Sequence, residues 1–63
     1  MNEYKVSMFN MSTSQMDLLE VFAGCYAIRD GVLHFYVRWG DELPIQSFAD
    51  GAWQMVYKVE EAN

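Results

Sequence analysis

The Asp30-Gly31 pair constrains the fold of this chain more than any other feature, because it stands between two long apolar-rich segments. A two-residue type I′ turn needs positive φ at both central residues, and Asp and Gly tolerate that conformation. Residues 22–39 therefore predict a β-hairpin. The short turn also sets the register of the two arms. The expected opposed positions are Arg29 and Val32, Ile28 and Leu33, Tyr26 and Phe35, Gly24 and Val37, and Phe22 and Trp39.

This register gives the hairpin one apolar face and one mixed face. Phe35 lies in the middle of the apolar face, opposite Tyr26, and is expected in the core. The indoles of Trp39 and Trp53 are also expected in the core, although either one at a sheet edge would be a natural anchor for binding. A single short sheet cannot cover its second face with its own loops, so the mixed face favours a homodimer or a protein partner. The mixed face consists of Ala23, Cys25, Ala27, Arg29, Val32, His34, Tyr36 and Arg38.

Residues 14–23 admit two interpretations. Ser14, with Asp17 three residues later, can open a helix that Gly24 closes. The same residues alternate between apolar sets in a way that is typical of a strand from about Leu18, and the hairpin offers that strand a partner. We favour the strand.

Two further signals complete an all-β pattern. Alternation over residues 4–11 predicts a first strand, and Asp50-Gly51 predicts a second hairpin within residues 45–59. The sequence thus predicts a single small domain, an antiparallel meander of four to five strands forming a half-open barrel or two-layer sheet. The alternative is an α+β chain of order βαβββ, with a short helix near residues 14–23. The second hairpin would oppose Phe48 to Trp53 and Gln46 to Met55.

Acidic side chains are expected to meet at the open end of the first hairpin. Its register would bring Glu20 opposite Asp41, and like charges at opposed positions are unfavourable. Pairing should therefore end before Gly40, or Gly40 should form a bulge. In either case an acidic cluster forms at this end, which is the candidate partner-binding surface; the alternative is solvated loop charge that keeps the chain soluble. The acidic cluster consists of Asp17, Glu20, Asp41 and Glu42.

A second candidate surface combines cations and aromatic rings on the mixed face: Arg29, His34, Tyr36 and Arg38. Such a face can stack the bases of single-stranded nucleic acid. The net charge of −5 repels phosphate, however, so direct nucleic-acid binding is not expected. Cys25 and His34 are diagonal neighbours about 7 Å apart at Cα. The sequence shows no orienting group or oxyanion site for them, so no catalytic role is expected.

Composition argues against several other classes. Nine acidic residues against four basic ones favour a basic partner surface. One His and one Cys cannot complete a four-ligand zinc site, and no calcium-loop spacing is present, so no metal or cofactor is expected. The first residues, MNEYKVSM, lack a signal-peptide pattern and no segment reaches membrane-spanning length, which favours a cytoplasmic chain without membrane association.

These patterns favour a small, acidic, non-enzymatic interaction protein. Its expected partner is a larger protein with a basic surface. The concrete form is an inhibitor of a nucleic-acid-handling or defence complex in the cytoplasm of an infected bacterium, such as the anti-CRISPR proteins of phages and mobile elements. Size and charge support this expectation, and no motif does. The alternatives are a self-assembling structural or regulatory subunit and, with less support, a single-strand nucleic-acid binder.

Overall fold

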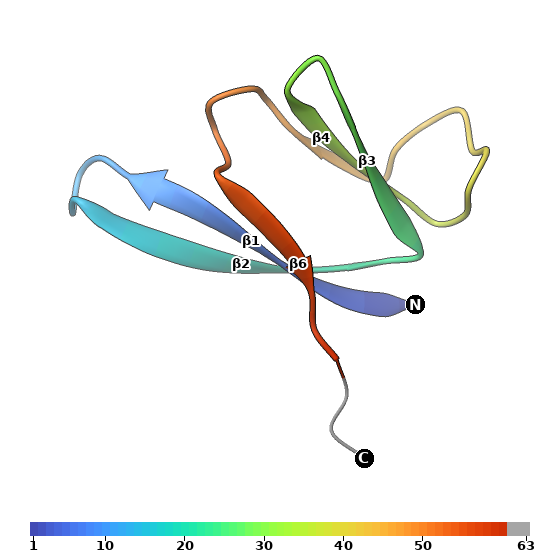
Figure 1. Cartoon of the computed structure of the whole chain (residues 1–63), viewed down its shortest axis with the longest axis horizontal. Helices are drawn as coiled ribbons and strands as arrows, with labels where there is room; N and C mark the ends of the chain where they lie inside the picture. The colour runs from blue at the N-terminus through green and yellow to red at the C-terminus, as the bar shows by residue number, and fades with distance from the viewer. Residues whose placement is uncertain (61–63) are drawn as a thin grey trace.

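The computed structural model describes residues 1–60, which contain six strands and no helix (Figure 1). The strands form two three-stranded antiparallel sheets, of order β2-β1-β6 and β3-β4-β5. The all-β class is therefore confirmed, with six strands rather than four to five. The strands are β1 (Asn2–Asn10), β2 (Gln15–Ala23), β3 (Cys25–Arg29), β4 (Val32–Tyr36), β5 (Gln46–Phe48) and β6 (Met55–Lys58).

The segment with two interpretations is a strand, and the helical alternative is wrong. β2 runs antiparallel to β1 over its whole length, with Val21 opposite Tyr4 and Leu19 opposite Val6. A helix of about ten residues is marginal by itself, whereas β1 offers a partner at every position of β2. The partner is nevertheless not the one expected, because β2 pairs with β1 and not with the hairpin.

The first hairpin forms as predicted near its turn. Asp30 and Gly31 have φ of 52° and 79°, and the register runs from Arg29 opposite Val32 to Cys25 opposite Tyr36. This confirms the inner half of the predicted register and shows that pairing ends before Gly40. The outer pairing is wrong: Phe22 lies in β2, opposite Glu3, and not opposite Trp39.

Gly24 turns the chain from one sheet into the other. Its N–H donates to the carbonyl of Tyr36 at 2.8 Å, so Gly24 and Cys25 both lie opposite Tyr36, as in a β-bulge. A Cβ at position 24 would stand 1.7 Å from the carbonyl oxygen of Val37. Only glycine allows the two backbones to approach so closely.

The second Asp-Gly pair makes a turn but not a hairpin. The Ala52 N–H donates to the Ala49 carbonyl at 3.0 Å, and Gly51 has φ of 86° while Asp50 has no positive φ. That is the pattern of a type II turn, which splays its arms where a type I′ turn would align them. β5 therefore stays beside β4, and β6 crosses to β1. The opposed positions are Phe48 and Leu33, Gln46 and Phe35, and Met55 and Ser7.

The core lies between the two sheets. The ring of Tyr4, from β1, lies 5.4 Å from the ring of Tyr26 and 5.5 Å from that of Phe35, so aromatic contacts join the sheets. Phe35 is fully buried, as predicted. Met8, Tyr26, Trp53 and Val56 pack around the buried cluster. That cluster consists of Tyr4, Val6, Val21, Ala23, Leu33, Phe35 and Phe48.

The two Asp-Gly turns contact each other. The indole N–H of Trp53 donates to the carbonyl of Gly31 at 3.0 Å, which confirms that this indole packs inward. The Asp50 carboxylate lies against Gly31, where an added Cβ would stand 2.6 Å from Asp50 Cγ. The segment that carries the chain between the sheets is thus fixed to the hairpin turn.

Candidate functional site

The β2-β1-β6 sheet has one face in the core and one face toward solvent. Because side chains alternate along a strand, Tyr4 and Val6 point inward while Lys5 and Ser7 point outward. The register extends this alternation to both neighbouring strands. The outer face consists of Glu3, Lys5, Ser7 and Phe9 from β1, Met16, Leu18, Glu20 and Phe22 from β2, and Met55 and Tyr57 from β6.

Large apolar side chains cover most of this outer face. Six of them are between 41% and 59% exposed. Together they present roughly 500 to 600 Å² of apolar surface, at the upper end of the largest patch on a typical monomer. The largest apolar patch of a monomer is often functional. The six are Phe9, Met16, Leu18, Phe22, Met55 and Tyr57.

An ion pair stands in the middle of the outer face. Lys5 Nζ lies 3.8 Å from Glu20 Oε1 across the β1–β2 pair. Beside it Ser7 is only 3% exposed, since it lies opposite both Leu18 and Met55 and their side chains flank it. The only base on the outer face is therefore already paired.

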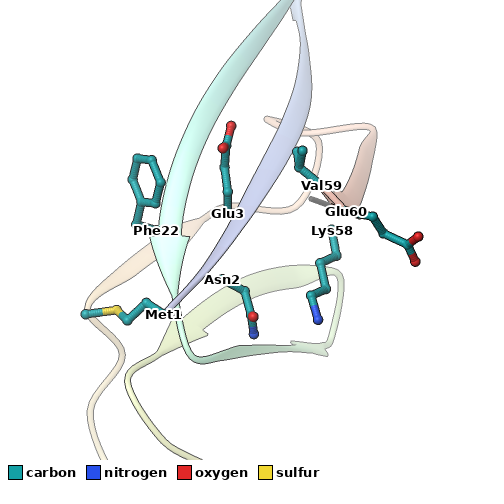
Figure 2. Close-up of a pocket in the computed structure, with 7 residues that line it drawn as sticks. All are labelled: Met1, Asn2, Glu3, Phe22, Lys58, Val59 and Glu60. Carbon is teal, nitrogen blue, oxygen red and sulfur yellow. The ribbon is translucent and has the colours of Figure 1, made fainter. Parts of the chain in front are cut away.

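A hollow of about 520 Å³ lies at one end of the sheet, where the start of β1 meets the ends of β2 and β6. Figure 2 shows Glu3 between Phe22 and Val59 on one side of the sheet, with Asn2 and Lys58 directed to the other side. The outer face therefore ends in a carboxylate set between apolar side chains. The hollow is lined by Met1, Asn2, Glu3, Phe22, Lys58, Val59 and Glu60.

The structure does not bring the acidic cluster together. Glu20 lies opposite Lys5 instead of Asp41, because β2 pairs with β1. Asp17 accepts a hydrogen bond from Asn10 Nδ2 at 3.1 Å, near the β1–β2 turn. The loop at residues 37–45, which carries Asp41 and the exposed Glu42, lies at the opposite end of the molecule (Figure 1). The register argument that placed these four side chains at one end was wrong.

The cationic and aromatic surface is partly assembled. Arg29 and Tyr36 line a hollow of about 140 Å³ together with Trp39 and Asp41. The ring of His34 lies 6.2 Å from that of Tyr36. Arg38 is exposed in the loop after β4 and is not among the residues that line this hollow.

One residue near this surface differs from its expected role. Trp39 is 75% exposed, so its assignment to the core was wrong. It precedes Gly40, which has φ of 90°, in a turn where the Asp41 N–H donates to the Arg38 carbonyl at 3.3 Å. This is the pattern of a type II turn with Trp39 as its first central residue, and the Trp39 side chain projects into solvent.

A hydrogen bond between His34 and Ser47 was not foreseen. His34 Nδ1 and Ser47 Oγ lie 2.7 Å apart because β5 pairs with β4 and places Ser47 opposite His34. Among residues 1–60, Ser47 is the only side chain hydrogen-bonded to His34, so no carboxylate orients this imidazole. Cys25 is buried and lies opposite Tyr36. The arrangement lacks the third group that a nucleophilic pair needs.

The outer face was also missed, although its signal is present in the sequence. Met16, Leu18 and Phe22 stand at alternate positions with only Glu20 interrupting them, which is typical of an apolar strand face. Pairing of β2 with the hairpin, as expected, would have placed that face in the core.

Three properties complete the description. Within residues 1–60, no three His, Cys, Asp or Glu side chains lie close enough to hold a metal ion. The same part of the chain contains no helix that is long and apolar enough to cross a membrane. Comparison of the chain with family models, with curated proteins and with solved structures finds no match.

Proposed function

We propose that this chain is a non-enzymatic interaction protein that binds a larger protein through the outer face of its β2-β1-β6 sheet. The observation that carries the proposal is the row of six exposed apolar side chains on that face. Burial of apolar surface is the main favourable term in protein association. An apolar area of this size supplies most of one side of a standard interface, about 800 Å² per partner.

Charge supports a partner with lysine or arginine around its own apolar patch. The Lys5–Glu20 pair adds no net charge to the outer face, so Glu3 on that face and Glu60 at its end leave it acidic. The whole chain carries a net charge of −5. Such a field speeds encounter with a basic surface and repels an acidic one.

The finer form of the proposal is an inhibitor. Proteins that handle nucleic acid present basic grooves for phosphate contacts, and an acidic protein with an apolar face can occupy such a groove. A phage or mobile-element inhibitor of a bacterial defence complex, resembling anti-CRISPR proteins in role and acting in the cytoplasm, has this size and charge. The acidic cluster enters this proposal as separate steering charges, because Asp17, Glu20, Asp41 and Glu42 do not share one site.

The test is capture of a partner by wild type and by two matched variants. Met55→Glu adds a charge to the outer face on its β6 strand, and Leu43→Glu makes the same change at a loop residue that is also exposed. We expect wild type and Leu43→Glu to capture the same protein from bacterial lysate, and Met55→Glu to lose it. Circular dichroism melts of both variants would verify that each is folded.

Two outcomes would contradict the proposal. Equal capture by Met55→Glu and Leu43→Glu would remove the outer face as the docking surface. Binding of the captured partner that strengthens with added salt would contradict the proposed lysine or arginine residues around the partner's apolar patch. Attraction between opposite charges weakens as salt screens it.

A second candidate function is a self-assembling structural or regulatory subunit. The free edge of β2 favours it, because β2 is the end strand of its sheet and is exposed from Gln15 to Glu20.

A further inference from the structure

β2 is an unprotected sheet edge. It is nine residues long, and from Gln15 to Glu20 every residue is exposed. Natural edge strands are usually short, or carry proline, lysine or a bulge that prevents pairing with another chain. β2 has no proline, lysine or bulge between Gln15 and Ala23. Its only charges are Asp17, on the core-side face opposite Met8, and Glu20, which is paired with Lys5.

The hydrogen-bond pattern of β1 shows which of its backbone groups face β2. The Val59 N–H donates to the Glu3 carbonyl at 2.8 Å. Glu3 and Val59 become opposed when the β1–β6 register, with Tyr4 opposite Lys58, is extended by one residue. Opposed residues of an antiparallel pair alternately make and omit these bonds. Alternate residues of β1, starting with Glu3, therefore bond to β6, and those between them, starting with Tyr4, bond to β2.

The same alternation identifies the free groups of β2. Tyr4 lies opposite Val21 and Val6 opposite Leu19, so Val21 and Leu19 use their backbone groups on β1. The residues at the alternate positions of β2 direct their backbone N–H and C=O groups away from the sheet. These outward residues are Met16, Leu18, Glu20 and Phe22.

We propose that β2 pairs with β2 of a second copy of this chain, antiparallel and centred on Leu19. Leu19 is the midpoint of Gln15–Ala23, so this register alone uses the whole strand. The outward backbone groups of Leu18 meet those of Glu20 in the other copy, and Met16 meets Phe22 in the same way. The two sheets become one continuous sheet, and their outer faces join on one side of it. This inference deepens the self-assembly candidate of the proposed function and does not depend on the outer face as a docking surface.

Charge separates this register from the one centred on Glu20, and strand length separates it from the one centred on Leu18. Centring on Glu20 would place the two Glu20 carboxylates directly opposite each other, which is unfavourable. Centring on Leu19 places Glu20 opposite Leu18 and Asp17 opposite Val21, so no acid faces an acid. The two Glu20 side chains become diagonal neighbours, and each already has Lys5 of its own copy at 3.8 Å.

The first test is sedimentation equilibrium over a wide range of concentration. Wild type should approach twice 7.3 kDa as concentration rises. Added salt should strengthen association, because two copies of charge −5 repel each other and salt screens that repulsion. This is the opposite of the salt effect expected for a basic partner. A mass of 7.3 kDa at every concentration and salt level would overturn the dimer.

Leu18→Pro and Leu18→Ala separate strand pairing from contact between faces. Both remove the leucine side chain, but only proline removes an N–H, and that N–H points away from β1. We expect Leu18→Pro to raise the dimer dissociation constant by about tenfold or more relative to Leu18→Ala, since one outward donor is lost and the edge is distorted. Equal dissociation constants would overturn pairing through the β2 edge.

A crosslink tests the register even if Leu18→Pro fails to fold. At the centre of the pairing, Leu19 faces its own copy in a non-hydrogen-bonded position, where Cα atoms are about 4.5 Å apart. That distance suits a disulfide. Leu19→Cys should form a covalent dimer under mild oxidation, whereas wild type, whose Cys25 is buried, and Met55→Cys should not. No crosslink at position 19, or an equal yield at position 55, would overturn the register.

Discussion

At the scale of single residues, a few backbone contacts decide where the chain changes direction. Gly24 lets β2 pass into β3 because it has no side chain to meet the Val37 carbonyl. Trp53 holds the segment between β5 and β6 against the first hairpin through one hydrogen bond to Gly31. Each of these contacts can be removed by a single substitution.

Gly24→Ala should destabilise the protein by about 2 to 3 kcal/mol, because its methyl group would overlap the Val37 carbonyl and the two backbones would have to separate. Gly51→Ala is the matched control. Nothing lies within 4 Å of a Cβ at position 51, so only its positive φ should count, at about 1 kcal/mol. Urea unfolding of both variants measures the difference, and equal losses would mean that the close approach at Gly24 does not exist in solution.

Phe35→Ala should cost about 3 to 5 kcal/mol, enough to unfold most of so small a protein. Phe35 is fully buried, and its ring contacts those of Tyr4, Tyr26 and Phe48 from both sheets. Thermal melts followed by circular dichroism give the result. A cooperative melt near the wild-type temperature would show that the two sheets do not pack through this ring.

Trp53→Phe should cost about 1 kcal/mol, since phenylalanine keeps most of the apolar contact but cannot donate to the Gly31 carbonyl. Chemical denaturation midpoints of wild type and variant would show the loss. No change would indicate that the contact between the two turns adds no stability.

At the scale of elements, local turn chemistry was predictable and long-range pairing was not. Asp30-Gly31 fixed its own register because both residues take positive φ. Asp50-Gly51 has the same sequence, yet Asp50 keeps a negative φ, and the two arms then part into different sheets. Local propensity cannot separate these cases, because the second turn also contacts Gly31 through the Asp50 carboxylate and the Trp53 indole N–H.

The candidate site was misplaced for the same reason. The acidic cluster depended on β2 pairing with the hairpin, and β2 instead pairs with β1. The residue types of β2 and their alternation were visible in the sequence. The partner strand, however, determines which face of β2 is covered. Strand partners far apart in sequence leave no local signal, so the outer face emerged only with the fold.

Amide hydrogen exchange should alternate along β2. At low protein concentration we expect Leu18 and Glu20 to exchange fast because their N–H groups face solvent, and Leu19 and Val21 to exchange slowly because theirs bond to β1. At high concentration the outward amides should slow if β2 pairs with a second copy. NMR exchange at two concentrations shows both effects, and uniform protection along β2 at low concentration would contradict the derived pattern.

At the scale of the whole molecule, thinness explains the exposed surface. The shortest extent of the Cα trace is 14 Å, and in the view along that axis the two sheets lie largely side by side (Figure 1). Both sheets contribute to one buried cluster, whereas the outer face of the β2-β1-β6 sheet stays exposed. A protein of this size buries only about 60% of the surface of its unfolded chain. Association is therefore a physical route to stability as well as to function.

The thermal midpoint should rise with protein concentration. Association of folded copies stabilises them by mass action, because the unfolded chain does not form the paired edge. Calorimetric scans over about a hundredfold range of concentration would reveal the shift, and Leu18→Pro should reduce it. A midpoint that stays constant for wild type would indicate that the folded chain gains no stability from a second copy.

The pairing of β1 with β6 has a consequence for how the chain folds. Tyr4 lies opposite Lys58, so the central strand of one sheet completes its pairing only with a strand far along the sequence. The β3–β4 hairpin needs only neighbours in sequence and can form first. During synthesis β1 and β2 can form a two-stranded ribbon, but its apolar side has no cover until the rest of the chain emerges. The nascent chain therefore passes through a stage in which aggregation and chaperone capture compete with folding.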